Sequence, residues 1–383
     1  MKFPLKIAFC IRPDYLLRAG GDTIQLLKTK EYLEKYYDIK GDIITDPDKI
    51  DCIYDVCHIF NIATTKVTYN FIKVCQEKKV PKAISTILWD FSDVMTCDKL
   101  VKMNIYNLSR FNVNVAKAIF KITAKIINKP YIMSKAYRHY LTIVLNDVDH
   151  ILPNSLEELY CLANVAQMDY GYLAGKSTIV CNGIIPTREV TISNVDLENK
   201  YAYLPPKYVL EVARIEPGKN QLNLLRALEK DNNLPILLIG SQEVFPKYYN
   251  KIAQIAQRRG NVYFIEQVAH NHLAYFYQNA LVHVLPSYAE TTGLVSIEAL
   301  VNGCRAVVSN KKHCPYETYF KNLASYVDPF NINSIRNAIF SEINTKRNMS
   351  EIRMIINKSF TWEIAARKTY YAYIKIIEQQ GLK

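Results

Sequence analysis

Short apolar runs alternate along this chain with longer stretches of helical pattern. Five such runs fall in the first half, namely KIAFC, DIIT, CIYDVCHIF, AISTILW and DHILP. Runs of this length are typical of buried strands, whereas the spacing of Leu26, Leu33 and Tyr37 indicates a helix. The alternation predicts an α/β fold built on a parallel sheet.

The alternation is interrupted once and then restarts. Asn182-Gly183, Pro186 and Pro205-Pro206 mark an irregular stretch, after which YVLEVARI, PILLIG, NVYFIE and LVHVLP continue the pattern. The chain has 383 residues, which is more than one ordinary hydrophobic core accommodates. We therefore expect two domains, with their boundary in the irregular stretch.

Composition and charge narrow the range of partners. Apolar residues make up 49% of the chain and charged residues 22%, so it can bury substantial cores. The net charge of +12 favours a phosphate-bearing ligand, an anionic membrane surface or a nucleic acid. The nine cysteines are scattered, with no CxxC motif and no spacing typical of a zinc site. Neither a secretory leader nor an apolar run long enough to span a membrane is recognisable. We expect a cytoplasmic protein.

Residues 112–129 form a basic amphipathic pattern. Lysines recur every fourth position and apolar residues hold another face; the two sets are Lys117, Lys121, Lys125 and Lys129, and Val115, Ile119, Ile122 and Ile126. Two interpretations stay open. Either the apolar face packs on the domain and the lysines are solvated, or the helix makes a peripheral contact with anionic lipid at the inner face of the membrane.

The stretch ETTGLVSIE places two carboxylates, Glu290 and Glu298, around a small polar turn after a predicted strand. If a helix starts near Thr292, the free amides of Thr292, Gly293 and Leu294 form an anion cradle at its positive end. Glu290 could then contact the group attached to that anion, and Glu298 could accept hydrogen bonds from a ribose diol. The alternative is that Glu290 caps the helix and Glu298 is solvated.

A second basic turn follows the strand YVLEV. In VARIEPGKNQ, Arg214 and Lys219 flank a Pro-Gly turn, where they could bind a doubly charged diphosphate at the same sheet edge. Together these stretches resemble the retaining nucleotide-sugar glycosyltransferases of GT-B fold, in particular glycosyltransferase family 4 (the group 1 family). The resemblance extends to ILPNSLEEL, VCNGI, HCPYETYF, YVDPFNINSI and SFTWEIAARKTYYAYIKII.

This resemblance implies a fold and a domain plan. The fold would be α/β, with two Rossmann-like domains facing across a cleft. Residues 1–190 would form the acceptor-side domain and residues 207–360 the nucleotide-sugar-binding domain. Residues 361–383 would form a C-terminal helix that crosses back to the first domain.

The resemblance also implies roles for individual residues. Arg214 and Lys219 are similar to the diphosphate clamp and, with Glu290 at the donor sugar, would be the catalytic set. Glu298 would bind the ribose. Thr292, Gly293 and Leu294 resemble the phosphate turn, Gly20-Gly21 the glycine loop of the opposite domain, and Val268 the backbone site for the base.

One departure from the family is the sequence STILWDFSD, which carries Asp90 where many relatives have a histidine near the sugar. His58 in DVCHIF also ends a predicted strand and is a candidate for the sugar or acceptor side, although a lone histidine in an apolar run is commonly structural.

The resemblance implies a transferase that retains anomeric configuration and moves a sugar from a UDP-sugar or GDP-sugar to a saccharide or lipid-linked acceptor in polysaccharide biosynthesis. No metal and no dedicated base would be required. Rival interpretations are a metal-dependent transferase using Asp147 and Asp149 or Asp46 and Asp48, a nucleotide-sugar epimerase or a sugar phosphorylase of similar fold, and a basic lipid- or nucleic-acid-binding module. Since the basic residues are dispersed, we expect no nucleic acid partner.

Overall fold

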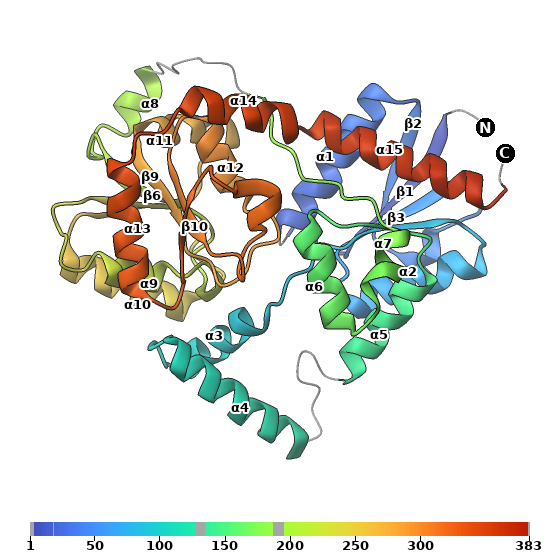
Figure 1. Cartoon of the computed structure of the whole chain (residues 1–383), viewed down its shortest axis with the longest axis horizontal. Coiled ribbons are helices and arrows are strands. Elements are labelled where there is room, and N and C mark those ends of the chain that lie inside the picture. Colours follow the sequence, from blue (N-terminus) through green and yellow to red (C-terminus); the bar gives the residue numbers. More distant parts are fainter. Residues whose placement is uncertain (1–3, 18, 127–134, 187–194, 382–383) are drawn as a thin grey trace. The chain divides into compact units, whose positions relative to one another are not determined.

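The structure is a computed structural model that describes residues 4–17, 19–126, 135–186 and 195–381 (Figure 1). The chain divides into two compact units, of which the first combines residues 1–89, 130–185 and 359–383. The second combines residues 90–129 and 186–358. These units differ from the expected domain bounds in one long segment, because residues 90–129 belong to the second unit and not to the first.

A five-stranded parallel sheet forms the first unit, in the order β2-β1-β3-β4-β5. Its strands coincide with the five apolar runs of the first half: β1 Leu5–Cys10, β2 Ile39–Ile44, β3 Val56–Phe60, β4 Lys82–Ser85 and β5 His150–Leu152. The helices of this unit are α1 Gly21–Tyr36, α2 Thr65–Glu77, α5 Lys135–Asp147, α6 Leu156–Ala166, α7 Tyr170–Gly175 and α15 Trp362–Gln379. The strands β3, β4 and β5 are buried along their whole length because helices cover such a sheet on both faces, whereas β2, at the edge of the sheet, is partly exposed.

The last helix, α15, belongs to the first unit, where it packs along α1 (Figure 1). The chain segment that leads into it runs past Gly183, and a bridge joins Ile184 to Thr361. A Cβ at Gly183 would lie 2.1 Å from the backbone nitrogen of Trp362. Only glycine permits this close approach of two backbones.

The second unit contains a six-stranded parallel sheet in the order β11-β10-β9-β6-β7-β8. The strands are β6 Tyr208–Val212, β7 Ile236–Ile239, β8 Val262–Ile265, β9 Ala280–Leu285, β10 Ala306–Ser309 and β11 Ser325–Val327. The helices are α3 Ser92–Lys102, α4 Arg110–Ile126, α8 Val195–Lys200, α9 Gln221–Ala227, α10 Pro246–Arg259, α11 Leu273–Asn279, α12 Leu294–Val301, α13 Ile332–Asn344 and α14 Met349–Ser359. Both sheets have the parallel, helix-covered form of a Rossmann-like domain, as the alternating pattern predicted.

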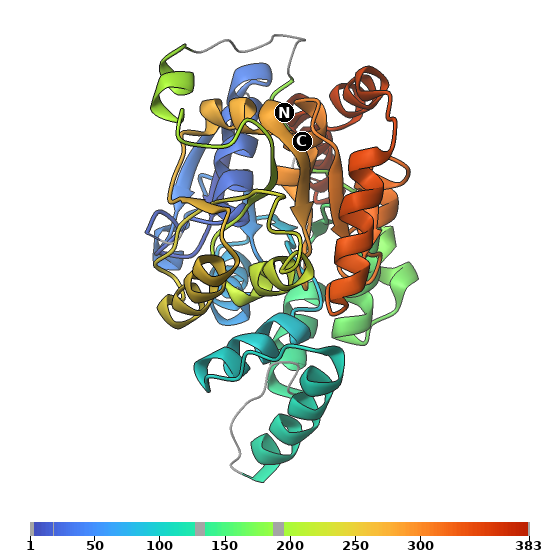
Figure 2. The same cartoon turned by 90° about the vertical axis from the view of Figure 1, so that its left-hand side faces the viewer.

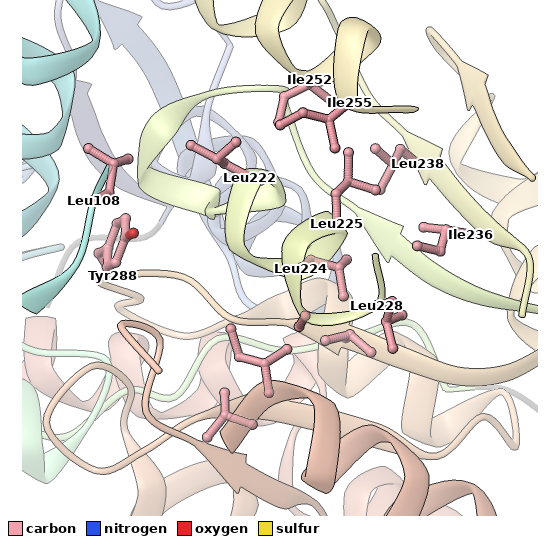
Figure 3. Close-up of a cluster of buried hydrophobic side chains, with 14 of the residues drawn as sticks. Leu108, Leu222, Leu224, Leu225, Leu228, Ile236, Leu238, Ile252, Ile255 and Tyr288 are labelled. Atoms are coloured by element: carbon pink, nitrogen blue, oxygen red, sulfur yellow. The ribbon is translucent and has the colours of Figure 1, made fainter. Parts of the chain in front are cut away.

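The core of the second unit is centred on α9. Figure 3 shows Leu225 of this helix beside Leu238 of β7 and Ile255 of α10, and Leu108 beside Tyr288. Leu108 comes from the segment between α3 and α4, and it is fully buried in this cluster. Residues of α3, of α4 and of the segment between them therefore contribute to the second unit's core.

Helix α4 packs through a different face from the one that the sequence pattern suggested. Val113 and Ala116 are buried in the core of the second unit, and Phe120 packs against it. The expected apolar stripe is exposed instead, with Val115 at 42%, Ile119 at 51% and Ile122 at 60%. The packing interpretation of that stripe is thus wrong for these three residues. The side chains of Lys125 and Ile126, and the whole of Lys129, lie outside the described residues.

In the parts of the chain that the structure describes, no helix has the length and apolar character needed to cross a membrane.

Candidate functional site

The predicted site residues of the second unit gather where the strand order of the sheet reverses. Strand β6 lies between β7 and β9, so the connections from β6 and from β9 leave the sheet in opposite directions. Parallel sheets bind ligands at such a switch point, beyond the carboxyl ends of the strands. Arg214 and Lys219 follow β6, and Glu290 follows β9.

Lys219 and Glu290 form an ion pair at this edge. The Lys219 Nζ atom lies 2.7 Å from Glu290 Oε1, and the two side chains are 23% and 13% exposed. Burial alone would lower the pKa of Lys219, but the charges of Glu290 and Glu216 raise it above its usual value. The amine is therefore protonated and can bind an anionic ligand.

Arg214 supplies a second cation on the same turn. Its guanidinium is 44% exposed and lies 3.3 Å from Glu216 Oε1. Arginine binds phosphate oxygens in bidentate geometry, and an exposed surface pair of this kind contributes little stability. Arg214 can thus exchange its carboxylate partner for a phosphate at small cost.

Backbone and amide hydrogen bonds hold the two turns together. The Tyr288 amide donates to the Gly218 carbonyl at 2.9 Å, which joins the segment after β9 to the 3-10 turn Pro217–Lys219. The buried Asn220 side chain donates to the carbonyls of Pro286 at 3.0 Å and Pro329 at 2.7 Å. These contacts fix the separation between Lys219 and Glu290.

Helix α12 begins at Leu294, two residues later than the start expected near Thr292. Gly293 is its N-cap and has a φ of +73°, a left-handed conformation that favours glycine. Thr292 is buried at 4% exposure beside it. The helix therefore directs its positive end toward the region of Glu290, where the sequence places the phosphate turn.

Glu298 lies about one turn into α12 and faces the loop after β8. Its Oε1 is 2.8 Å from His270 Nε2, and its Oε2 accepts from the Tyr277 hydroxyl at 3.5 Å. Val268 is half-buried in that loop, two residues before His270. The structure thus brings the predicted ribose ligand close to the predicted base site.

The remaining candidates occupy other positions. Asp90 is exposed and accepts a hydrogen bond from the Ser92 amide at 2.9 Å, at the start of α3. Gly20 and Gly21 open α1 in the first unit, with Gly20 as its N-cap. Beyond Gly21 there is open space, because a Cβ there would meet no atom within 4 Å.

His58 is a core residue. It is 1% exposed, its Nδ1 lies 2.6 Å from the Tyr373 hydroxyl, and its Nε2 lies 2.9 Å from Ser85 Oγ. Burial lowers its pKa to about 3, so the ring is neutral. Because both ring nitrogens are engaged inside the unit, the arrangement corrects the tentative assignment of His58 to the sugar or acceptor side.

The aspartates of the metal-dependent alternative have structural contacts. Asp149 accepts from the Lys82 amide at 2.7 Å and pairs with its amine at 3.4 Å. Asp147 ends α5, and Asp46 accepts from the Asp48 amide at 3.2 Å. Across the described ranges, no three His, Cys, Asp or Glu side chains form a group that could hold a metal ion.

Sequence reasoning missed a set of buried polar residues beneath the basic turn. They are Glu211, Asn220, Gln221 and Asn223, all at most 3% exposed. Asn223 donates to the Tyr288 hydroxyl at 3.2 Å and to the Pro329 carbonyl at 3.1 Å. The only available signal was the polar run KNQLN after a strand, which also fits a solvated turn.

Comparison with known proteins agrees with this geometry. Residues 196–354 match the family described as Glycosyl transferases group 1. The O-antigen chain mannosyltransferase B of Escherichia coli is 27% identical over 187 residues, which are 45% of this chain and 47% of that enzyme. The aligned region thus spans about half the length of this curated relative.

Solved structures resemble the whole chain. Sucrose-phosphate synthase from Thermosynechococcus elongatus has a TM-score of 0.71 at 17% identity, covering 98% of this chain and all of the other. HepE from Anabaena, solved in complex with UDP-glucose, has a TM-score of 0.67 at 14% identity, covering 99% of this chain and all of the other. These likenesses show a shared two-domain Rossmann-like fold. The family match covers residues 196–354, which lie within the second unit, and together with the mannosyltransferase relative it supports a glycosyltransferase.

Proposed function

We propose that the protein transfers a sugar from a nucleotide-diphosphate sugar to a saccharide acceptor. The observation that carries this proposal is the Lys219–Glu290 ion pair at the switch point of the second sheet. A cation and a carboxylate held together there provide one group for a diphosphate and one for the sugar attached to it. HepE, which shares the fold, was solved with UDP-glucose, and this supports the donor class.

In this proposal each residue has a separate task. Arg214 and Lys219 bind the diphosphate, and the amides at the start of α12 add to the stabilisation of its growing negative charge. When the diphosphate engages Lys219, Glu290 is released to position the sugar and to stabilise positive character at its reacting carbon. Glu298 gives up its hydrogen bond with His270 and accepts hydrogen bonds from the ribose hydroxyls instead.

The transfer would retain the configuration of the sugar, by front-face attack in which a diphosphate oxygen takes the acceptor proton. Two cations and helix amides can stabilise the leaving group, so we propose that no metal is required. The acceptor would be a growing polysaccharide or a lipid-linked saccharide. The mannosyltransferase relative, whose name refers to an O-antigen chain, supports this class.

Calorimetric titration with UDP, GDP and their common sugars tests the proposal. It is run first in EDTA and then with Mg²⁺ or Mn²⁺. Saturable binding of one nucleotide in EDTA is the expected result. Binding that appears only with metal would favour the metal-dependent alternative, and the absence of binding to any nucleotide would favour a basic lipid- or nucleic-acid-binding module. Transfer to a saccharide acceptor, measured with the donor so identified, separates a transferase from an epimerase.

We also propose that α4 docks on an anionic membrane surface, at the cytoplasmic face. Phe111 is 75% exposed and continues the exposed row of Val115, Ile119 and Ile122 along one side of the helix. In Figures 1 and 2, α4 lies beside α3. Of the basic residues in this helix, Arg110 and Lys117 pair with Asp93, whereas Lys121 is exposed next to Ile122, and the helix contains no acidic residue. An apolar face with a basic border is typical of interfacial helices.

Co-sedimentation with phosphatidylglycerol and phosphatidylcholine vesicles tests the docking of α4. Wild-type protein is expected to bind the anionic vesicles at low salt and to lose most of this binding when Phe111 and Ile119 are both changed to serine. Met354→Ser, which changes an exposed apolar residue of α14, serves as the matched control. If the double variant binds vesicles as the wild type does, or if it abolishes a dimer seen in ultracentrifugation instead, lipid docking is rejected.

A further inference from the structure

A buried carboxyl group lies beneath the basic turn that carries Arg214 and Lys219. Glu211 is the fourth residue of β6 and is 1% exposed. Its Oε1 accepts a hydrogen bond from Gln221 Nε2 at 3.0 Å, and the same Nε2 atom donates to the carbonyl of Arg214 at 3.1 Å. Glu211 and Gln221 thus connect the interior of the sheet to the first residue of the turn.

The surroundings of Glu211 cannot stabilise a negative charge. Lys219, the cation whose charge acts on Glu211, has its amine 2.7 Å from Glu290, and Glu211 Oε2 has no hydrogen-bond partner among the described residues. Gln221 Oε1, another buried acceptor, is also without one within that part of the chain. One amide donor does not compensate the desolvation of a buried carboxylate, whereas a protonated carboxyl is itself a donor and leaves fewer acceptors without a partner.

We propose that Glu211 is a positioning residue whose neutral carboxyl holds Gln221, and through it the Arg214 carbonyl, so that Arg214 and Lys219 meet the donor diphosphate in a fixed geometry. This inference rests on the proposed function of the site. A neutral group suits the position because an ionised one would compete with the diphosphate for Lys219.

The charges around Glu211 agree with this role. Burial raises its pKa well above the usual value, Lys219 opposes the increase, and Glu290 adds to it. On the side of α10, the buried Tyr248 faces Glu211, and burial keeps its hydroxyl neutral by raising its pKa well above the usual value. Tyr248 in turn accepts a hydrogen bond from the Leu222 amide at 3.0 Å, at the start of α9. Ionisation of Glu211 would therefore place a second negative charge beside the Lys219–Glu290 pair.

Two substitutions of similar size separate the neutral carboxyl from an ionised one. Glu211→Gln keeps an acceptor for Gln221 and adds a donor, so its kcat and KM at pH 7 are expected to stay within about threefold of wild type. Glu211→Met removes the acceptor and is expected to lower kcat/KM at least tenfold, while circular dichroism and thermal unfolding report whether the unit stays folded. Because the Glu211 carboxyl is neutral, Glu211→Gln is expected to keep the pH profile of donor affinity that the wild type has around pH 7.

The outcomes distinguish this inference from the proposed function. If wild type neither binds a nucleotide nor transfers a sugar, both are rejected. If wild type is active and Glu211→Gln loses tenfold or more while folded, an ionised carboxylate is needed and the inference alone is overturned. It is also overturned if folded Glu211→Met retains wild-type kinetics, or if Glu211→Gln changes the pH profile of donor affinity around pH 7.

Discussion

Replacement of Lys219 by alanine is the most direct test of the site. The amine lies 2.7 Å from Glu290 and is the better buried of the two cations on the turn, at 23% side-chain exposure against 44% for Arg214. A fixed cation that stabilises a leaving group contributes about 3–4 kcal/mol to catalysis, so its loss is expected to lower kcat by roughly a hundredfold to a thousandfold. Donor affinity is expected to fall less, because Arg214 and the start of α12 remain.

The same substitution has a structural consequence that must be separated from the chemical one. It leaves the Glu290 carboxylate, 13% exposed, without its partner amine. An unpaired, largely buried charged group costs about 1–3 kcal/mol of folding stability. The double variant Lys219→Ala with Glu290→Gln removes that unpaired charge. It is expected to recover the stability but not the turnover, because it lacks both the leaving-group cation and the carboxylate placed at the sugar.

The assay is release of nucleoside diphosphate at saturating donor and acceptor, alongside chemical denaturation of each variant. Lys230→Ala, which changes an exposed lysine of the same unit, is the matched control and is expected to keep wild-type turnover. If folded Lys219→Ala turns over within threefold of wild type, the leaving-group role of this lysine is refuted. If the double variant recovers turnover as well as stability, the single variant's loss was structural.

Three further predictions concern single contacts. Glu298→Ala removes the carboxylate near Val268 and is expected to weaken nucleotide diphosphate binding about tenfold to a hundredfold in calorimetry; unchanged affinity would remove Glu298 from the site. His58 has a folded-state pKa of about 3 against an ordinary 6.5, so its contribution to stability is complete above pH 6.5 and is lost as the pH falls toward 3. Between pH 7.5 and 5.5 the wild type is expected to lose about 1.3 kcal/mol more unfolding free energy than His58→Phe, and equal losses would contradict a neutral buried ring. Gly183→Ala forces a contact with the Trp362 backbone and is expected to destabilise the first unit by about 1–3 kcal/mol in chemical denaturation, whereas wild-type stability would show that α15 can shift freely.

The strands and the basic turn could be predicted from the sequence because their signals are local. The run YVLEV, apolar except for Glu211, is buried over all five residues, as expected for a strand inside a parallel sheet. Arg214 and Lys219 follow that run directly in the sequence. They must therefore lie at the edge of the sheet where the strand has its carboxyl end. The approach of Glu290 to Lys219 followed from the rule that the carboxyl ends of parallel strands share an edge.

The packing of residues 90–129 could not be predicted in this way. Both faces of α4 contain apolar residues, and the period of the pattern does not say which face meets a core. The choice depends on long-range partners: Arg110 pairs with Asp93 and Asp328, and its guanidinium lies 3.7 Å from the centre of the Phe330 ring. Asp328 and Phe330 lie more than 200 residues further along the chain, so no local window contains the information.

The burial of the amide side chains beneath the site could not be predicted either, and its reason is the convergence of two loops. Asn220 and Gln221 look like solvated turn residues, yet both are fully buried because the turn and the loop after β9 converge above them. Converging loops leave backbone carbonyls such as those of Pro286 and Arg214 inside the protein, and each needs a donor. Amide side chains supply donors without charge. Uncharged amide side chains therefore satisfy the buried carbonyls beneath the basic turn. The charged groups of Arg214 and Lys219 are not needed for this and can bind an anion at the surface.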